Sequence, residues 1–275
     1  MIDTHTHLNF AAFTHDWSEV VEQSIERRVS AMIVVGTDIA TSAKAVEISQ
    51  SNKALYAAVG IHPHHAKGIH TTEEVDELIA EIAKLALDPK VVAIGEIGID
   101  HHEYKDSKYT TSDINVATYN QLQVQLFRKQ LEVAIRLGKP VIVHSRSARD
   151  EALQIIEAVN ATAQKKITGV FHCFEGSKKM VKRVIEAGLH ISFTANITFI
   201  PDRLDVATLV PLDRLLLETD CPYMAPASMR GERNTPSSVT MVAAAHAASR
   251  AIDSIQVEMQ TDKNARTLFQ LDSHS

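Results

Sequence analysis

The chain has 275 residues, of which 45% are hydrophobic, and its formal net charge is −6, from 28 Lys and Arg against 34 Asp and Glu. This length and apolar content are sufficient for one large buried core, so we expect a single domain over residues 1–275. The negative charge excludes a strongly basic protein that holds nucleic acid by neutralising many phosphates, although it is compatible with a local basic patch.

The composition also bears on the cellular compartment. The chain begins with an apolar strand pattern, without the basic and apolar regions of a secretory signal peptide, and no apolar run reaches membrane-spanning length. Cys173 and Cys221 are too few for a disulfide framework and fit a reducing compartment. We therefore expect a cytoplasmic protein without a membrane contact.

Short apolar runs alternate with longer segments of helical period, which is the pattern of repeated strand and helix units around a parallel sheet. Strands are expected at residues 2–4, 31–35, 55–59, 91–94, 141–144, 167–172, 190–193 and 215–217. Eight such strands in a chain of this length favour a (β/α)8 barrel (TIM barrel) of the α/β class. An open doubly wound sheet is the alternative.

Helices are expected between these strands, at residues 16–28, 40–51, 72–87, 116–137, 148–159 and 178–187, with a C-terminal pair within 237–269. Gly138 and Pro140 mark the end of the long fourth helix. Two irregular segments, 99–115 and 221–236, each follow a strand. In a barrel, both segments lie at the end where active sites form.

Histidines and carboxylates stand at the ends of the expected strands. Six residues share this position: His5, His7, Glu96, His144, His172 and Asp220. His5 and His7 are two apart on an extended strand, so their side chains point to the same face, and a barrel gathers all strand ends at one mouth. A single residue of this kind is more often a hydrogen-bonded cap than a ligand. Because six agree in position, we expect a metal site.

Four imidazoles and two carboxylates form a mixed set of nitrogen and oxygen donors, which suits Zn, Mn or Mg ions. Six ligands exceed the need of one tetrahedral ion, so we expect two divalent ions per chain, bridged by Glu96. Cys173 and Cys221 are expected to be packing residues, because the neighbouring position on a strand points away from the ligands.

Eight motifs together resemble those of a known family. They are IDTHTHL from Ile2, VGIHPHHA from Val59, AIGEIGID from Ala93, PVIVHSRSARDE from Pro140, FHCFEGS from Phe171, ISFTANITF from Ile191, LLLETDCPYMAP from Leu215 and RGERNTPSSV from Arg230. Nearly end to end, the chain resembles the TatD family of metal-dependent deoxyribonucleases, although an HxH triplet alone is shared by the wider amidohydrolase superfamily. The resemblance implies a TIM barrel and the same six metal ligands.

The resemblance also implies a set of substrate-binding residues. These are His62 and His64 of the HPH turn, Arg146 two residues beyond His144, and the pair Arg233 and Asn234 on the last loop. An arginine offers paired donors to two oxygens of a phosphodiester. The implied substrate is DNA with single-stranded or frayed ends, bound transiently by a monomer, in a setting such as DNA repair.

The expected reaction is hydrolysis of DNA by an exonuclease with an activated water, in which Glu96 and Asp220 are the catalytic residues and Asp220 is both ligand and general base. One alternative is an amidohydrolase-type enzyme acting on a small amide, lactone or phosphoester. Another is a nucleic-acid-binding module with a structural metal, against which six ligands argue, because structural sites are closed cages of four.

The segment after the fourth strand departs from the family pattern. It is longer by about a dozen residues and should lie over the mouth of the barrel, where it could narrow or extend the substrate groove. Its polar and aromatic residues are His101, His102, Tyr104, Lys105, Lys108 and Tyr109.

Overall fold

The computed structural model describes residues 1–104, 110 and 115–272. Lys105, Lys108 and Tyr109 of the long segment lie outside these described residues. The strands are β1 (Ile2–Thr6), β2 (Ala31–Val35), β3 (Leu55–Val59), β4 (Val91–Asp100), β5 (Val141–Arg146), β6 (Gly169–Phe171), β7 (His190–Phe193) and β8 (Leu215–Leu217).

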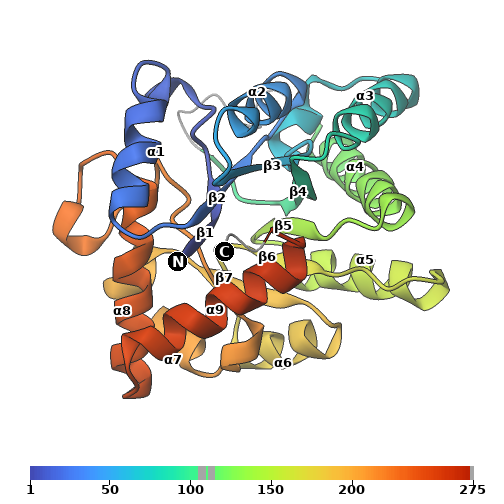
Figure 1. The fold of residues 1–275 in the computed structure, drawn as a ribbon. Coiled ribbons are helices and arrows are strands. Elements are labelled where there is room, and N and C mark those ends of the chain that lie inside the picture. Colours follow the sequence, from blue (N-terminus) through green and yellow to red (C-terminus); the bar gives the residue numbers. More distant parts are fainter. Residues whose placement is uncertain (105–109, 111–114, 273–275) are drawn as a thin grey trace.

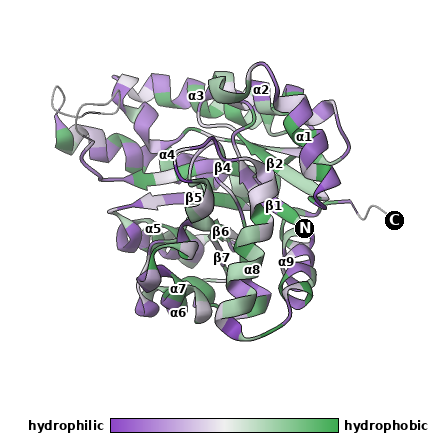
Figure 2. Ribbon diagram, turned by 90° about the vertical axis from the view of Figure 1, so that its left-hand side faces the viewer, coloured by the Kyte–Doolittle hydropathy of each residue, from purple (hydrophilic) through white to green (hydrophobic). Residues whose placement is uncertain are grey.

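The helices surround the strands, which form the centre of the molecule (Figure 1). They are α1 (Trp17–Glu26), α2 (Ile39–Gln50), α3 (Thr72–Leu85), α4 (Val116–Leu137), α5 (Arg149–Thr162), α6 (Lys178–Glu186), α7 (Pro201–Thr208), α8 (Val239–Arg250) and α9 (Ser254–Phe269). They carry both hydrophilic and hydrophobic residues (Figure 2), as expected for helices with one face on a sheet and the other in water. In the described part of the chain, no helix is long and apolar enough to span a membrane.

The eight strands form one parallel sheet in the order β1 to β8. The chain that follows β8 then pairs with β1, where Thr6 and Cys221 form a parallel bridge and His7 N donates to Cys221 O at 2.8 Å. The buried Asp3 carboxylate strengthens this junction, because it accepts from the backbone N of Thr219 at 3.0 Å and from its hydroxyl at 2.6 Å. The sheet is therefore a single-domain (β/α)8 barrel, as predicted, and not an open sheet.

Side chains of successive strand residues enter two different cores. On β2, Ala31, Ile33 and Val35 belong to an apolar cluster built from strands together with the end of α9. Met32 and Val34 belong to the larger cluster that the strands share with the surrounding helices. This is the alternation of a strand with one face toward the barrel axis and one toward the helical layer.

Helix α9 covers the end of the barrel at which the strands begin (Figure 1). The N-terminal ammonium lies 3.5 Å from the carboxylate of Asp262 in this helix, and Asn264 donates to Leu215 O at 2.8 Å. The opposite end, where the strands finish, is the mouth that carries the polar residues discussed below.

A β-bulge in β1 directs its two histidines. Residues 3–6 of β1 pair with residues 32–34 of β2, so β1 has one residue more than its partner over this stretch. A bulge bends the strand and re-aims side chains, and bulges are common beside active sites. His5 and His7, which follow the start of this bulge, both face the centre of the mouth.

A second irregularity lies in β4. Residues 94–97 pair with residues 141–143 of β5, which places an extra residue beside Glu96. Further along β4, Gly98 has φ 150°, and a Cβ at this position would lie 1.9 Å from the carbonyl oxygen of His144. Glycine is therefore needed for β4 to pair closely with the strand that carries His144.

The bounds of several elements differ from the prediction, and β1 and β5 each end two residues later than predicted. Strand β4 runs to Asp100, because backbone pairing with β5 continues through the glycines and the charged residue that interrupt its apolar run. Strand β6 starts only at Gly169. Helix α7 (Pro201–Thr208) was not among the expected helices, although the proline in its first turn is a typical helix start.

Candidate metal centre

The six predicted ligands converge at the mouth of the barrel, and the Glu96 carboxylate lies at their centre. Its Oε2 is 3.5 Å from His5 Nε2 and 3.7 Å from His7 Nε2. Its Oε1 is 2.9 Å from His144 Nδ1 and 2.8 Å from His172 Nε2. The two oxygens of one carboxylate thus face two different pairs of histidines, which is the arrangement expected of a bridging ligand.

Asp220 completes the half of the site around His5 and His7. Its Oδ1 is 3.3 Å from His7 Nε2 and 3.7 Å from His5 Nε2, and these two ring nitrogens are 3.2 Å apart. His7 Nδ1 lies 3.0 Å from the carbonyl oxygen of Val35. Because a carbonyl only accepts, Nδ1 carries the proton and Nε2 presents a lone pair to the centre. This half of the site therefore fits a cation.

The other half of the site is organised by Asp100. His144 Nε2 lies 3.1 Å from Asp100 Oδ2 and donates to it, which leaves Nδ1 to face Glu96 Oε1. His172 Nε2 is 3.4 Å from His144 Nδ1. A buried carboxylate that accepts from the outer nitrogen of a histidine is the usual support of a metal-ligating imidazole.

Burial and charge fix the protonation of these groups. Burial raises the pKa of Glu96, but the charges of neighbouring histidines, foremost His172, outweigh it and hold the pKa well below its usual range. Burial likewise raises the pKa of Asp220, but the neighbouring imidazoles of His7 and His5 outweigh this effect and lower the pKa. Burial lowers the pKa of His5. The carboxylates around His7, His144 and His172 outweigh burial and raise the pKa of these three histidines. Because a metal binds neutral imidazoles, a divalent cation would displace protons from them on binding.

Among the described residues, three groups of side chains have atoms close enough together to hold a metal ion. They are His5 with His7 and Glu96, His62 with Glu96 and His144, and His5 with His172 and Glu218. The first two groups share Glu96, as expected if this carboxylate bridges two ions.

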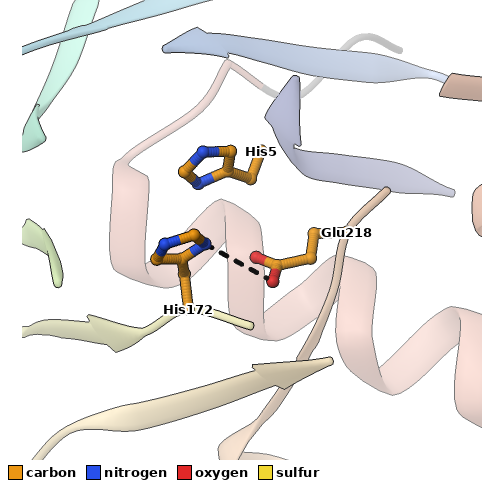
Figure 3. Close-up of side chains that lie close together, drawn as sticks. All are labelled: His5, His172 and Glu218. Carbon is orange, nitrogen blue, oxygen red and sulfur yellow. Dashed lines mark ion pairs between the residues drawn. The ribbon is translucent and has the colours of Figure 1, made fainter. Parts of the chain in front are cut away.

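Glu218, in the third group, was not predicted as a site residue. It is fully buried, and its Oε1 lies 3.7 Å from His172 Nδ1 beneath the stacked ring of His5 (Figure 3). Its oxygens also accept from Cys173 N at 2.6 Å and from the hydroxyl of Ser192 at 2.7 Å. Because both oxygens serve protein donors, this geometry suits a residue that orients His172.

Asp100 was also not predicted, because the fourth strand was expected to end before it. Its Oδ2 accepts from three side chains: His64 Nε2 at 2.8 Å, His144 Nε2 at 3.1 Å and the Tyr104 hydroxyl at 2.9 Å. The same hydroxyl accepts from Arg146 Nη1 at 3.1 Å. One carboxylate oxygen therefore connects a metal ligand with two residues predicted to bind substrate. Extending the strand to residue 100 would have placed Glu96 and Asp100 on one face.

A cavity of about 350 Å³ opens at this centre. Three of the predicted substrate residues line it, His62, His64 and Arg146, as do Tyr104 and Cys173. Burial raises the pKa of the Cys173 thiol well above its usual value, which keeps it protonated and unsuited to bind a metal.

The structure does not bring Arg233 and Asn234 to the wall of this cavity. Arg233 Nη1 lies 3.0 Å from a carboxylate oxygen of Asp16, and its guanidinium covers the ring of Phe13 at 4.6 Å. Asn234 is fully buried and donates to Thr219 O at 3.0 Å. Asn234 thus supports the loop that carries Asp220, whereas Arg233 fastens its own loop to the segment that contains Asp16, and neither residue lines the cavity.

The chain is similar to known proteins over nearly its whole length. A family model described as TatD related DNase matches residues 2–270. YabD of Bacillus subtilis, named as an uncharacterized metal-dependent hydrolase, is 33% identical over 273 residues, which cover 98% of this chain and 99% of that protein. A Klebsiella pneumoniae protein named 3'-5' ssDNA/RNA exonuclease TatD is 32% identical over 280 residues, which cover 99% of this chain and 98% of that protein.

A solved structure shares the architecture. The crystal structure of YjjV, a TatD homologue from Escherichia coli, aligns with a TM-score of 0.86 at 28% identity and covers 99% of this chain and 98% of that one. The family match over nearly the whole length, the barrel and the converging ligands lead to one conclusion. This chain belongs to the TatD family and is a metal-dependent hydrolase.

Proposed function

We propose that this hydrolase cleaves phosphodiester bonds of DNA as an exonuclease, with two divalent ions of Mg, Mn or Zn at its centre. The observation that carries the proposal is the division of the Glu96 carboxylate between two pairs of histidines, beside donors that suit a phosphate. The name of the Klebsiella relative supports nucleic acid as the substrate class.

The donor set fits two ions. One ion would have His5, His7, Asp220 and Glu96 Oε2, and the other would have His144, His172 and Glu96 Oε1. Bound divalent ions supply Lewis-acid charge and an activated water for hydrolysis of a phosphodiester.

The phosphate would be held by donors on the cavity wall. Arg146 is fixed there by its hydrogen bond to Tyr104, and a guanidinium has further N–H groups for phosphate oxygens. Burial lowers the pKa of His62 to about 3, so this ring is neutral. Its Nδ1 accepts from His64 N at 3.1 Å, so Nε2 carries the proton. This Nε2 lies 3.4 Å from Glu96 Oε1, so His62 places its donor beside the proposed metal centre, where a phosphate would bind.

Asp220 is the proposed general base. Its carboxylate is ionised, lies beside His7 Nε2 and lines the cavity, so it can take the proton of the attacking water. Arg146 then stabilises the negative charge that develops on the phosphate oxygens. A single chain supplies all of these groups, which makes a monomer sufficient for the reaction.

The test is to incubate the protein with single-stranded DNA, duplex DNA, RNA and a generic carboxylic ester, each with Mg, Mn or Zn and again after chelation. We expect mononucleotide release from the single strand, and loss of this release after chelation. Hydrolysis of the ester without nucleotide release would refute the nuclease and favour a small-molecule amidohydrolase. The cation Arg146 on the cavity wall argues against that second activity, because a neutral amide needs no such partner.

The role of Asp220 is tested separately with Asp220→Asn. This variant should lose at least about 100-fold in kcat, as expected for loss of a general base, with most of its metal content kept. If it hydrolysed DNA at the wild-type rate with unchanged metal content, Asp220 would not be the base.

A further inference from the structure

The polar cavity has one apolar side, formed by Phe10, Tyr223 and Met224, which we call the aromatic wall. Tyr223 is 54% exposed and Met224 is 37% exposed, although both lie at the entrance of the cavity. Exposed apolar side chains grouped at the rim of a polar site are typical of a surface that contacts a ligand.

The aromatic wall is held in a fixed geometry. The Phe10 ring stacks on the His7 ring at 4.2 Å with an interplanar angle of 15°, and the Tyr223 ring meets Phe10 edge-on at 6.4 Å. The backbone N of Tyr223 donates to Asp220 O at 2.9 Å, and Asn234 donates to Tyr223 O at 2.7 Å. The wall is therefore fastened to two of the proposed metal ligands, His7 and Asp220, which fixes its distance from the proposed metal centre.

The barrel topology places the aromatic wall across the mouth from the phosphate donors. Phe10 follows β1 and Tyr223 follows β8, and these two strands are neighbours where the barrel closes. Tyr104 and Arg146 belong to the chain at the ends of β4 and β5, halfway around the ring. Glu96, with the metal ligands, lies between the two sides.

The cavity thus has the cationic Arg146 on one side and aromatic rings on the other, and a nucleotide is divided in the same way. It has an anionic phosphate at one end and a flat, weakly polar base at the other. We propose that the aromatic wall stacks the base of the nucleotide whose phosphate lies at the metal centre. This inference rests on the proposed nuclease function and specifies its substrate. Stacking on aromatic rings tolerates every base, so the wall confers no sequence preference.

The proposal has a consequence for strand preference. A base that stacks on Phe10 or Tyr223 has left its own stack and its pairing partner, which costs least in a single strand. The wall therefore selects unpaired ends over duplex ends.

The decisive experiment compares short single strands that carry bases throughout with strands that have a tetrahydrofuran residue, which lacks a base, at both ends. Tyr223→Ala should lower kcat/KM about ten-fold for the complete strand and less than about two-fold for the strand without terminal bases, in line with loss of one stacking contact. Tyr223→Phe should restore the wild-type value. Phe199→Ala is the matched control, because Phe199 is an aromatic residue, 43% exposed, that does not line the cavity.

A second readout does not depend on catalysis. Terminal 2-aminopurine, whose fluorescence falls on stacking, should be quenched by the metal-free wild type and by Tyr223→Phe, and much less by Tyr223→Ala. Equal losses of kcat/KM on both strands, or no quenching by the wild type, would overturn the base-stacking role. If no strand were hydrolysed at all, the nuclease function would fail, and the quenching would still decide whether the wall binds a base.

Discussion

Replacing Asp100 with asparagine tests the polar network behind the metal centre. In the wild type, Asp100 Oδ2 accepts from His64, His144 and Tyr104, and Oδ1 accepts from the backbone N of His102 at 2.8 Å. Asparagine has nearly the same shape, but one of its two positions is an NH₂ group. If the NH₂ group takes the place of Oδ2, it faces the donors of His64, His144 and Tyr104, and if it takes the place of Oδ1, it faces the backbone N of His102. In either orientation a hydrogen bond is lost and two donors face each other.

The size of the effect follows from the contact with His144. A hydrogen bond to a charged group is worth about 1.5–3 kcal/mol, and removal of the outer partner of a ligating histidine costs roughly 10- to 100-fold in metal affinity or activity. We therefore expect Asp100→Asn to bind metal 10- to 100-fold more weakly than the wild type. Because the six ligands remain, a high metal concentration should restore a large part of kcat.

The assay is a calorimetric titration of the metal-free protein with Mn²⁺, together with kcat/KM over a range of Mn²⁺ concentrations. Tyr104→Phe is the matched control, because it removes one donor to Asp100 and keeps the bond to His144. Its metal affinity should stay within about three-fold of wild type, in keeping with the small net worth of a single hydrogen bond, while KM rises because Arg146 loses its partner. A folded Asp100→Asn variant with wild-type metal affinity would refute the supporting role of this carboxylate.

Three further predictions concern the metal and pH. The double variant His5→Ala, His7→Ala should lose metal and activity but keep the wild-type far-UV circular dichroism. Chelation should abolish activity and lower Tm, since an ion at 100 times its Kd stabilises the fold by about 2.7 kcal/mol, and Mn²⁺ should restore both. Burial and the charge of Arg250 lower the pKa of His246 from 6.5 to about 3, so the unfolded chain alone takes up this proton as the pH falls below 6.5. Between pH 7 and pH 5 this proton uptake lowers the free energy of unfolding by about 2 kcal/mol. In urea titrations, His246→Met should abolish this pH dependence, whereas the control Val242→Ala should keep it.

The convergence of the six proposed metal ligands could be predicted from the sequence because their positions follow from the architecture. In a parallel barrel, the ends of all strands meet at one mouth, so residues as distant as His5 and Asp220 become neighbours once the strands are counted. The contacts between His5, His7 and Glu96 confirm this convergence. Periodicity and topology are sufficient to predict this convergence, because no side-chain detail is needed to decide at which strand end a residue lies.

The supporting residues could not be predicted in the same way. Asp100 lies on a strand whose apolar pattern is interrupted by Gly95, Glu96 and Gly98. The strand predicted from this pattern therefore ended before Asp100. Glu218 sits in a motif where only the neighbouring Asp220 was assigned a role. In both cases, the function depends on which atom a carboxylate faces, and a sequence does not specify this.

The structure departs most from the expectation in the direction of two side chains. Arg233 and Asn234 stand on a mouth loop, as expected, but Arg233 turns outward to Asp16 and Asn234 turns inward beneath the loop. A loop has no fixed periodicity, so the direction of its side chains follows from local hydrogen bonds.

Backbone strain gathers at the metal centre, and Asn234 explains how it persists. Asp220 and Met224 have φ values of 54° and 52°, in the left-handed region that side chains rarely adopt, and each costs on the order of 1 kcal/mol. Such strain persists only where neighbouring contacts hold it. Asp220 N donates to His5 O at 2.9 Å, and Asn234 fixes the carbonyls of Thr219 and Tyr223 on either side. The buried amide of Asn234 thus holds a proposed catalytic carboxylate and the proposed base-binding wall in one rigid turn, so both would be lost together if the turn relaxed.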